Sequence, residues 1–316
     1  MDYAAGVDFG GTSAKIGLIG KDGTVLARDA LPVDPRASFQ EVLDPVAARL
    51  EVLSRQMPPG DRLVVIGIGM PGFIEKQQGT VVGGCENIPG LQRKSAQTYL
   101  ARSFGVPAFS ENDATSAAAA ELIFGAGRTF TSFLLITLGT AIGGGLVLDG
   151  RVYRGSRGFA GEVGHICVVP DGVPCNCGSR GCFEQYASGT AMARVYREKL
   201  RKRGRDDPAA TARTVADMAR SGDEPARQTI EEAARYIAQA LGSVLNLLDL
   251  QACLIGGGVA EAGDILLEPV RRRLPDYCWP EIAKGVQVLP AGLGNDAGIL
   301  GAAAQALERL DGTEGA

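Results

Sequence analysis

Short apolar runs that stop at glycines alternate along the chain with longer stretches of helical pattern. The opening, YAAGVDFGGTSAKIGLIGKDGTVLARDA, predicts a strand, a glycine-rich bend, a second strand, a Lys-Asp-Gly turn and a third strand. A helix is expected over residues 39–55 and an apolar strand over residues 63–69. That strand is followed by Pro71-Gly72, where we expect a loop near a ligand.

The next stretch predicts a helix over residues 91–104 and a short strand over residues 106–109. After this strand, Glu111-Asn112-Asp113-Ala114 leads into TSAAAAELIFGAG, which is strongly helix-forming. Asp113 therefore lies where a strand becomes a helix, close to the helix N-terminus. On this stretch alone an N-cap role is the simpler interpretation of Asp113, and catalysis is the alternative.

The second half of the chain repeats the opening pattern. The segment FLLITLGTAIGGGLVLDGRV again predicts a strand, a Gly-Thr bend, a strand and an Asp-Gly turn, which suggests a duplicated fold. Mostly helical sequence follows over residues 187–250, and residue 252 opens a buried strand, a triple-glycine bend and a helix. A last strand and an alanine-rich helix end the chain, and residues 311–316 are expected to fray.

Three of these bends can offer backbone amides to an anion such as a phosphate. The residues at the bends are Gly10, Gly11 and Thr12, then Gly139 and Thr140, then Gly256, Gly257 and Gly258. If the two hairpin bends face each other across a shared cleft, they hold a phosphate chain more specifically than either bend alone. Asp8, at the end of the first strand, is a candidate to hold a hydrated magnesium ion.

One segment, GFAGEVGHICVVPDGVPCNCGSRGCFE, contains the only histidine of the chain and four of its seven cysteines. His165, Cys175, Cys177 and Cys182 can converge on one ion, and an imidazole with three thiolates is a ligand set that suits structural zinc. Four protein ligands leave no open position for catalysis at the metal. A cluster of free thiols is the alternative interpretation.

The same segment carries two glutamates, Glu162 shortly before the first candidate ligand and Glu184 just after the last. Whatever fixes the metal therefore also fixes two carboxylates, which is a way to build a rigid polar pocket. A glutamate on a loop is more often a solvated charge, and spacing alone favours that simpler interpretation.

Composition removes several classes of function. A chain of 316 residues exceeds the length at which one hydrophobic core stops growing, and 45% apolar content can fill two domains. A net charge of -4 with both signs interspersed argues against a nucleic-acid or membrane-surface partner. No apolar run approaches the roughly 20 residues of a membrane span and no signal-peptide pattern starts the sequence, so we expect a cytoplasmic protein.

The remaining cysteines are not expected to form disulfides, because an odd total with a metal-type cluster is typical of a reducing compartment. We expect them to be small buried residues, namely Cys85, Cys167, Cys253 and Cys278.

The motifs taken together resemble the ROK family of sugar kinases and sugar-responsive repressors. They are DFGGT, Pro71-Gly72, ENDA with its alanine-rich helix, LGTAIGGG, GFAGEVGH, the Cys-x-Cys and Cys-x-Glu pattern, and LIGGGV. The resemblance covers nearly the whole chain. The GEVGH and cysteine portion is specific to that family, whereas the glycine bends are shared with the wider hexokinase and actin-like ATPase superfamily.

The resemblance implies an α/β, actin-like ATPase (ribonuclease H-like) duplicated fold of two lobes with a cleft between them. A smaller N-terminal lobe is expected over residues 1–112, joined by the C-terminal helix over residues 296–311. A larger lobe with the zinc motif is expected over residues 113–295. A homodimer or higher homo-oligomer is also expected.

The resemblance further assigns roles to individual residues. Asp113 becomes the general base. The sugar hydroxyls are expected to meet Asn112, Asp113, Glu162, His165 and Glu184, in a pocket also lined by Gly72 and Asn87. The nucleotide is expected to meet Gly10, Gly11, Thr12, Gly139, Thr140, Gly256 and Gly257, with Mg²⁺ accompanying ATP and Zn²⁺ held by His165, Cys175, Cys177 and Cys182.

Departures from the family pattern limit what the resemblance implies. Where many members have a lysine directly after GGT, this chain has Ser13-Ala14-Lys15, and Lys15 is therefore not expected at the nucleotide. Leu91 replaces a frequent aromatic residue, and Thr115 replaces a frequent asparagine. The first strand is expected from about Tyr3, which leaves no room in this sequence for the helix-turn-helix of the repressor branch.

The expected activity is transfer of the γ-phosphoryl group of ATP to the 6-hydroxyl of glucose. Fructose, mannose, N-acetylglucosamine and N-acetylmannosamine remain alternative acceptors, and the residues do not separate them. A sugar sensor without catalysis is the alternative from another class, and Asp113 with both hairpin bends argues against it.

Overall fold

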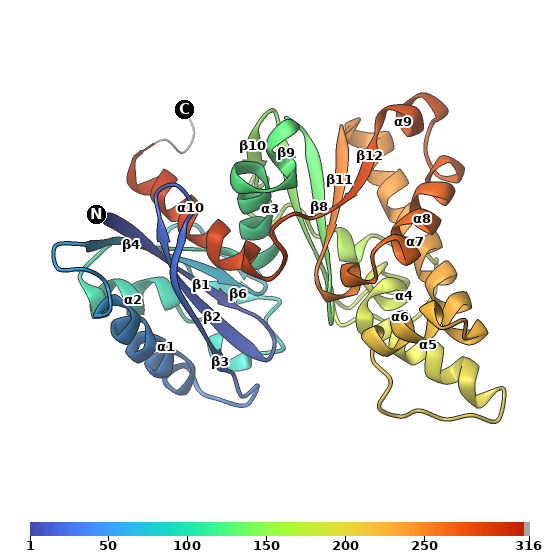
Figure 1. Cartoon of the computed structure of the whole chain (residues 1–316), viewed down its shortest axis with the longest axis horizontal. Coiled ribbons are helices and arrows are strands. Elements are labelled where there is room, and N and C mark those ends of the chain that lie inside the picture. Colours follow the sequence, from blue (N-terminus) through green and yellow to red (C-terminus); the bar gives the residue numbers. More distant parts are fainter. Residues whose placement is uncertain (313–316) are drawn as a thin grey trace.

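The computed structural model describes residues 1–312 and consists of two lobes, each built around one five-stranded sheet (Figure 1). The two sheets have the strand orders β3-β2-β1-β4-β7 and β10-β9-β8-β11-β12. In each, three strands form an antiparallel meander and two further strands add in parallel on the other side. The duplication that the two hairpins suggested is therefore confirmed at the level of whole sheets.

The elements of the first sheet come from the first third of the chain. Its strands are β1 (Asp2–Phe9), β2 (Ser13–Gly20), β3 (Val25–Pro32), β4 (Arg62–Met70) and β7 (Ala108–Asn112), with helices α1 (Phe39–Ser54) and α2 (Ala96–Phe104). A small two-stranded sheet, β5 (Phe73–Ile74) and β6 (Val81–Gly83), follows the end of β4.

The second sheet belongs to the larger lobe. Its strands are β8 (Phe133–Leu138), β9 (Ile142–Leu148), β10 (Arg151–Tyr153), β11 (Ala252–Gly256) and β12 (Gln287–Pro290). The helices of the rest of the chain are α3 (Asp113–Phe124), α4 (Glu184–Ala187), α5 (Gly189–Arg201), α6 (Ala212–Arg220), α7 (Glu224–Leu248), α8 (Asp264–Arg273), α9 (Pro280–Gly285) and α10 (Ala297–Leu310).

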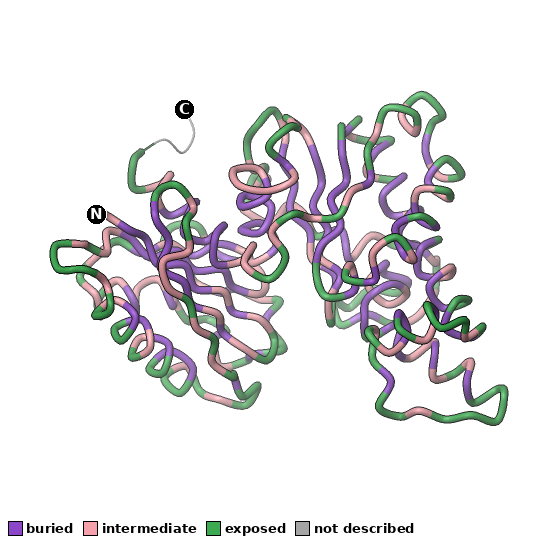
Figure 2. Tube along the Cα trace, viewed as in Figure 1, coloured by how far each residue is buried: buried purple, intermediate pink, exposed green. Residues whose placement is uncertain are grey.

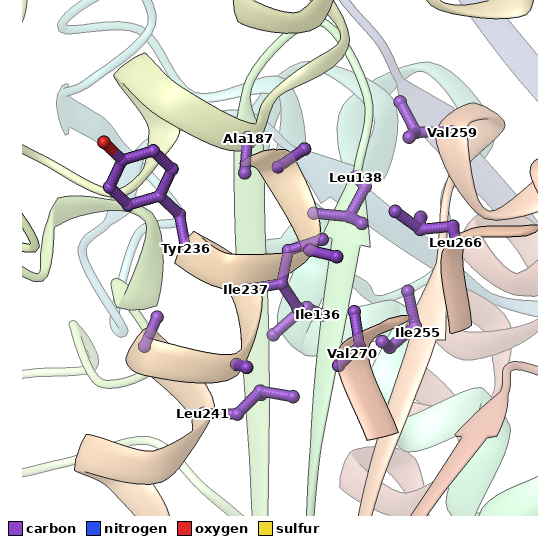
Figure 3. Packing of buried hydrophobic residues seen from close by; sticks show 14 of the residues in the cluster. Ile136, Leu138, Ala187, Tyr236, Ile237, Leu241, Ile255, Val259, Leu266 and Val270 are labelled. Carbon is purple, nitrogen blue, oxygen red and sulfur yellow. The ribbon is translucent and has the colours of Figure 1, made fainter. Parts of the chain in front are cut away.

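The core of the larger lobe forms between its sheet and the long helix α7. Ile136, Leu138 and Ile255 point from β8 and β11 toward Ile237 and Leu241 of α7 (Figure 3). The inner strands of both sheets are mostly buried, the edge strands β3, β10 and β12 are partly exposed, and the outer turns of the helices are exposed (Figure 2). Among residues 1–312, none of the helices combines the length and apolar character that a membrane span requires.

The last helix, α10, leaves the larger lobe and packs on the first sheet, close to the N-terminus (Figure 1). Glycines in the central strands make room for it. A Cβ at Gly6 would lie 2.0 Å from the carbonyl oxygen of Ile299, and a Cβ at Gly67 would lie 1.8 Å from that of Ala302. The backbone of α10 therefore rests directly on the backbone of β1 and β4.

The helix expected over residues 91–104 is wrong in its first turn. Pro89–Leu91 forms a short 3-10 turn, and Arg93 has a φ of 57°, which an α-helix does not accept. Helix α2 begins only at Ala96, where the side chain of Ser95 accepts a hydrogen bond from the amide of Thr98 at 3.0 Å.

Replacing Gly67 by alanine is expected to lower the free energy of unfolding by about 2 kcal/mol or more, because the new Cβ would collide with a carbonyl of α10. Urea denaturation measures this change. Gly285→Ala is the matched control, since a Cβ at Gly285 meets nothing within 4 Å. Equal stability of the two variants would contradict the close packing of α10.

Candidate active site

Asp113 is the first residue of α3, directly after the last residue of β7. The side chain of Asn112 accepts a hydrogen bond from the amide of Thr115 at 3.0 Å, so Asn112 is the N-cap. The N-cap interpretation of Asp113 is therefore wrong. Its Oδ1 accepts a hydrogen bond from the amide of Ala114 at 2.8 Å, which holds the carboxyl group at the edge of the cleft.

The environment of Asp113 favours its neutral form. Burial raises the pKa of Asp113 to about 7, and the negative charges of Asp8 and Glu162 add to the effect, while the amide of Ala114 opposes it. Burial likewise raises the pKa of Asp8, against the charge of Lys15. A carboxylate with a pKa near the working pH can accept a proton and release it again, as a general base must.

Asp8 and Asp113 both line a cavity of about 420 Å³ between the lobes. Gly256 and Gly257 of the triple-glycine bend also line the cavity, as do Ala297 and Gly298 at the start of α10. There the Cα of Gly298 lies so close that an added Cβ would be 2.3 Å from the Asp8 carboxylate.

Lys15 lines the same cavity, although the sequence did not place it there. Its Nζ lies 4.0 Å from Oδ2 of Asp8 and donates a hydrogen bond to the carbonyl oxygen of Asn295 at 3.1 Å. The available signal was the register of the first hairpin, in which Lys15 is the cross-strand partner of Asp8. Spacing along the chain does not reveal this relation, because it arises from the pairing of β1 with β2.

The two hairpin bends lie outside the lining of this cavity. They contain Gly10, Gly11 and Thr12 in the first bend and Gly139 and Thr140 in the second. Gly257 connects the cavity to the second bend, since a Cβ there would lie 2.4 Å from the carbonyl oxygen of Leu138. Gly257 also has a φ of 83°, a conformation that favours glycine.

The candidate sugar residues of the smaller lobe lie beside Asp113. The side-chain Nδ2 of Asn112 donates a hydrogen bond to the carbonyl oxygen of Gly72 at 3.2 Å. A Cβ at Gly72 would lie 2.2 Å from the carbonyl oxygen of Gly83, and its φ of 88° adds to the need for glycine. Asn87 faces the first hairpin bend, where a Cβ at Gly11 would lie 3.9 Å from it.

The candidate sugar residues of the larger lobe form an electrostatic group that reaches Asp113. Nε2 of His165 lies 3.8 Å from Oε2 of Glu162. Burial raises the pKa of Glu162, with the charge of His165 opposing and that of Glu184 adding to the rise. Since Glu162 in turn raises the pKa of Asp113, the larger lobe tunes an acid at the lobe boundary.

The expected metal ligands converge. The ligand atoms of His165, Cys175, Cys177 and Cys182 all lie within 4.8 Å of one another. Nδ1 of His165 is 3.6 Å from Sγ of Cys175, and Sγ of Cys177 is 3.6 Å from Sγ of Cys182. The edges of a zinc tetrahedron are about 3.5 Å between nitrogen and sulfur and about 3.8 Å between two sulfurs, so the four residues fit that ion.

Two further observations concern the thiols. Burial, together with Cys177 and Cys175, raises the pKa of Cys182 to about 12, so a thiolate there needs a cation beside it. The expectation that Cys167 is buried is wrong, because its side chain is exposed. Cys167 pairs through its backbone with Cys182, and this places it outside the four-residue cluster.

Glu184 lies between the metal cluster and the second hairpin. Its Oε1 is 3.7 Å from Sγ of Cys175, and its Oε2 accepts a hydrogen bond from the amide of Ile142 at 3.2 Å. Glu162 contacts His165, Glu184 contacts Cys175 next to His165, and the charge of Glu162 reaches Asp113. These four acidic and imidazole side chains, Asp113, Glu162, His165 and Glu184, are called the polar wall below.

One known protein family matches this chain over nearly its whole length. The model of the ROK family matches residues 4–309. The chain belongs to the ROK family. A glucokinase of Thermotoga maritima is 35% identical over 97% of this chain and 98% of that protein, and an N-acetylmannosamine kinase of Escherichia coli is 32% identical over 94% and 96%. A ROK family glucokinase from Streptomyces griseus, solved in complex with glucose and AMPPNP, has a TM-score of 0.83 at 33% identity and covers 97% of this chain and 99% of that chain.

Membership of the ROK family confirms the expected fold class, an actin-like, ribonuclease H-like duplication with two lobes and a cleft. The family pattern includes the glycine bends but not Lys15, which the hairpin register brings to Asp8 in this member.

The raised pKa of Asp113 predicts a pH-dependent effect of Asp113→Asn on stability. Between pH 3.8 and about 7 the folded protein keeps a proton that the unfolded chain has lost, so this residue makes folding less favourable as the pH rises. Asparagine carries no such penalty. The variant should exceed the wild type by on the order of 2–4 kcal/mol at pH 8 and by much less at pH 4.5.

Urea denaturation of both proteins across this pH range measures the difference. Titration of the metal cluster affects both proteins alike and cancels in the comparison. A difference that does not change with pH would contradict the raised pKa of Asp113.

Proposed function

We propose that this protein is an ATP-dependent hexose kinase that transfers the γ-phosphoryl group to the 6-hydroxyl of a sugar, most favourably glucose. The observation that carries the proposal is Asp113, an acid with a pKa of about 7. Asp113 lines a cavity together with Lys15 and the triple-glycine bend, and the charge of Glu162, which lies beside His165, reaches it as well. Relatives named glucokinase, one of them solved with glucose and AMPPNP, support it.

Asp113 accepts the proton of the sugar hydroxyl as that oxygen attacks the phosphorus. Phosphoryl transfer has a loose transition state, so the protein contributes mainly alignment and charge stabilisation. Asp8 would hold Mg²⁺, which when bound supplies positive charge to the phosphates. Lys15 adds a second positive charge beside Asp8.

The amides of the glycine bends would meet the phosphate chain. The nucleotide side then comprises Lys15 together with Gly10, Gly11, Thr12, Gly139, Thr140, Gly256 and Gly257.

The sugar is read by hydrogen bonds to its hydroxyls. A site built in this way rejects an acceptor that lacks a hydroxyl, because a buried polar group is then left without a partner. We assign the sugar contacts to Asn112, Asp113, Glu162, His165 and Glu184, with Gly72 and Asn87 lining the pocket. The relative named N-acetylmannosamine kinase makes that sugar the first alternative acceptor to test.

The metal cluster has a structural role in this proposal, since four protein ligands leave no open position on zinc. The geometry separates the two nitrogens of His165. Nδ1 faces Cys175 and would bind the metal, while Nε2 faces Glu162 and would meet the sugar.

Three further assignments belong to the proposal. The lobe boundary lies between residues 112 and 113, with residues 296–311 returning to the smaller lobe, which the packing of α10 on β1 and β4 supports. The protein acts in the cytoplasm, in glycolysis. It assembles as a homodimer or higher homo-oligomer, which light scattering in solution measures.

The proposal predicts that the protein forms glucose 6-phosphate and ADP from glucose and ATP-Mg. A panel of glucose, mannose, fructose, N-acetylglucosamine and N-acetylmannosamine, assayed by ADP release, ranks the acceptors. Asp113→Asn is the control, and its turnover should fall by about 10² to 10⁴ with sugar affinity retained. Failure of the wild type with every sugar, or a variant rate within a few-fold of wild type, would refute the assignment.

The two roles of His165 are separable by substitution. His165→Cys offers a fourth thiolate to the metal but nothing to the sugar, so zinc should stay while the KM for glucose rises roughly ten- to a hundredfold. His165→Ala should lose both zinc and thermal stability. Zinc content by atomic emission and glucose kinetics decide. A His165→Cys protein with full zinc and unchanged glucose kinetics would show that His165 serves the metal alone.

A further inference from the structure

The bend between β8 and β9 is held from one side by a single short segment of chain, residues 184–190. Three hydrogen bonds make the connection. They are Gly189 N to Gly139 O at 2.7 Å, Thr190 Oγ1 to Thr140 O at 2.8 Å, and Ile142 N to Glu184 Oε2 at 3.2 Å. A Cβ at Gly189 would lie 2.9 Å from the oxygen of Gly139, so glycine is needed for this approach.

Two of these bonds hold consecutive carbonyls of the bend, and this fixes the direction of two consecutive amides. In a trans peptide the C=O and the N–H point in opposite directions. Because the carbonyls of Gly139 and Thr140 point toward α5, the amides of Thr140 and Ala141 point away from it. Consecutive amides with a shared direction form the kind of cradle that binds a phosphate.

The holding segment is itself firmly anchored. It begins two residues after Cys182 of the metal cluster, and between them Phe183 is fully buried and donates its amide to the carbonyl oxygen of Ile166 at 2.8 Å. At its other end, Ser188 caps α5 by accepting a hydrogen bond from the amide of Ala191 at 3.1 Å.

Thr190 differs from the rest of this segment because its side chain is exposed. Ser188 already caps the helix, and the Thr190 hydroxyl bonds outside α5, to the carbonyl of Thr140. A hydroxyl at the second position of a helix contributes little to stability by itself. The hydrogen bond to the Thr140 carbonyl therefore suggests that the Thr190 hydroxyl serves to hold the bend.

We propose that Thr190 is a positioning residue for the phosphate donor: its hydroxyl holds the Thr140 carbonyl so that the bend presents its amides to the phosphates of ATP. This inference rests on the proposed function, which assigns Gly139 and Thr140 to the nucleotide. The Thr190 hydroxyl bonds to the bend and not to the polar wall. Removing it should therefore weaken binding of the phosphate donor and leave binding of the sugar unchanged.

Thr190→Val removes the hydroxyl with little change of shape. The KM for ATP should rise roughly three- to tenfold, and the Kd of a non-hydrolysable ATP analogue, measured by calorimetry, should rise by the same factor. The KM for glucose and the melting temperature should stay close to wild type. Thr190→Ser should restore nucleotide affinity, and Thr190→Ala should reproduce the valine variant.

Thr214→Val is the matched control, because Thr214 also uses its hydroxyl at the start of a helix, where it accepts a hydrogen bond from the amide of Thr211 at 3.1 Å. It should leave the Kd of the analogue unchanged. Unchanged nucleotide affinity in Thr190→Val would overturn the inference, as would an equal loss of ATP and glucose affinity. A wild type that phosphorylates no sugar would refute the proposed function itself, whereas the two outcomes above overturn the inference about Thr190 and leave the proposed function standing.

Discussion

The close approach of α10 to the first sheet is the constraint on which the site depends. The carbonyls of Ile299 and Ala302 occupy the space where Gly6 and Gly67 have no side chain. On its other side α10 meets α3 equally closely, since a Cβ at Gly301 would lie 1.7 Å from the carbonyl oxygen of Ser116. One helix therefore fixes both β1, which carries Asp8 near its end, and α3, which begins at Asp113. Backbone-to-backbone packing of this kind leaves α10 little freedom to move relative to β1, β4 and α3.

This packing also sets the electrostatics of the cleft. Gly298 covers part of the Asp8 carboxylate, and the resulting burial raises the pKa of Asp8. Asp8 and Glu162 then contribute to the raised pKa of Asp113. Placing three acids together destabilises the folded protein, and Lys15 offsets only part of that cost at Asp8. The arrangement makes sense if the function requires a neutral-range base beside a site for phosphates and a cation.

The sequence was sufficient to predict the features that depend on local pattern. The repeated hairpin pattern predicted the two matching sheets. The spacing of His165 and three cysteines predicted the metal cluster, whose ligand atoms the structure brings together. Features that depend on a partner elsewhere in the fold were missed. Lys15 reaches the cavity through its cross-strand relation to Asp8. Asn112 takes the N-cap because β7 runs to Asn112, three residues beyond the strand that the apolar pattern predicts. Cys167 is exposed, and its backbone pairs with Cys182 in the metal loop and not with a core strand.

The metal segment gains a wider role once its contacts are followed beyond the ligands. A loop rich in glycine and interrupted by prolines does not hold one shape by itself, so the ligand cluster supplies that order. The order then extends along the chain, through the buried Phe183 to Glu184, whose two oxygens meet Cys175 and the amide of Ile142. The metal segment thus holds His165 and Glu184 of the polar wall, and through Glu184 it also holds the second hairpin bend. In the proposed function this one rigid segment would contact both substrates and hold them in line, which is the main contribution that a protein makes to phosphoryl transfer.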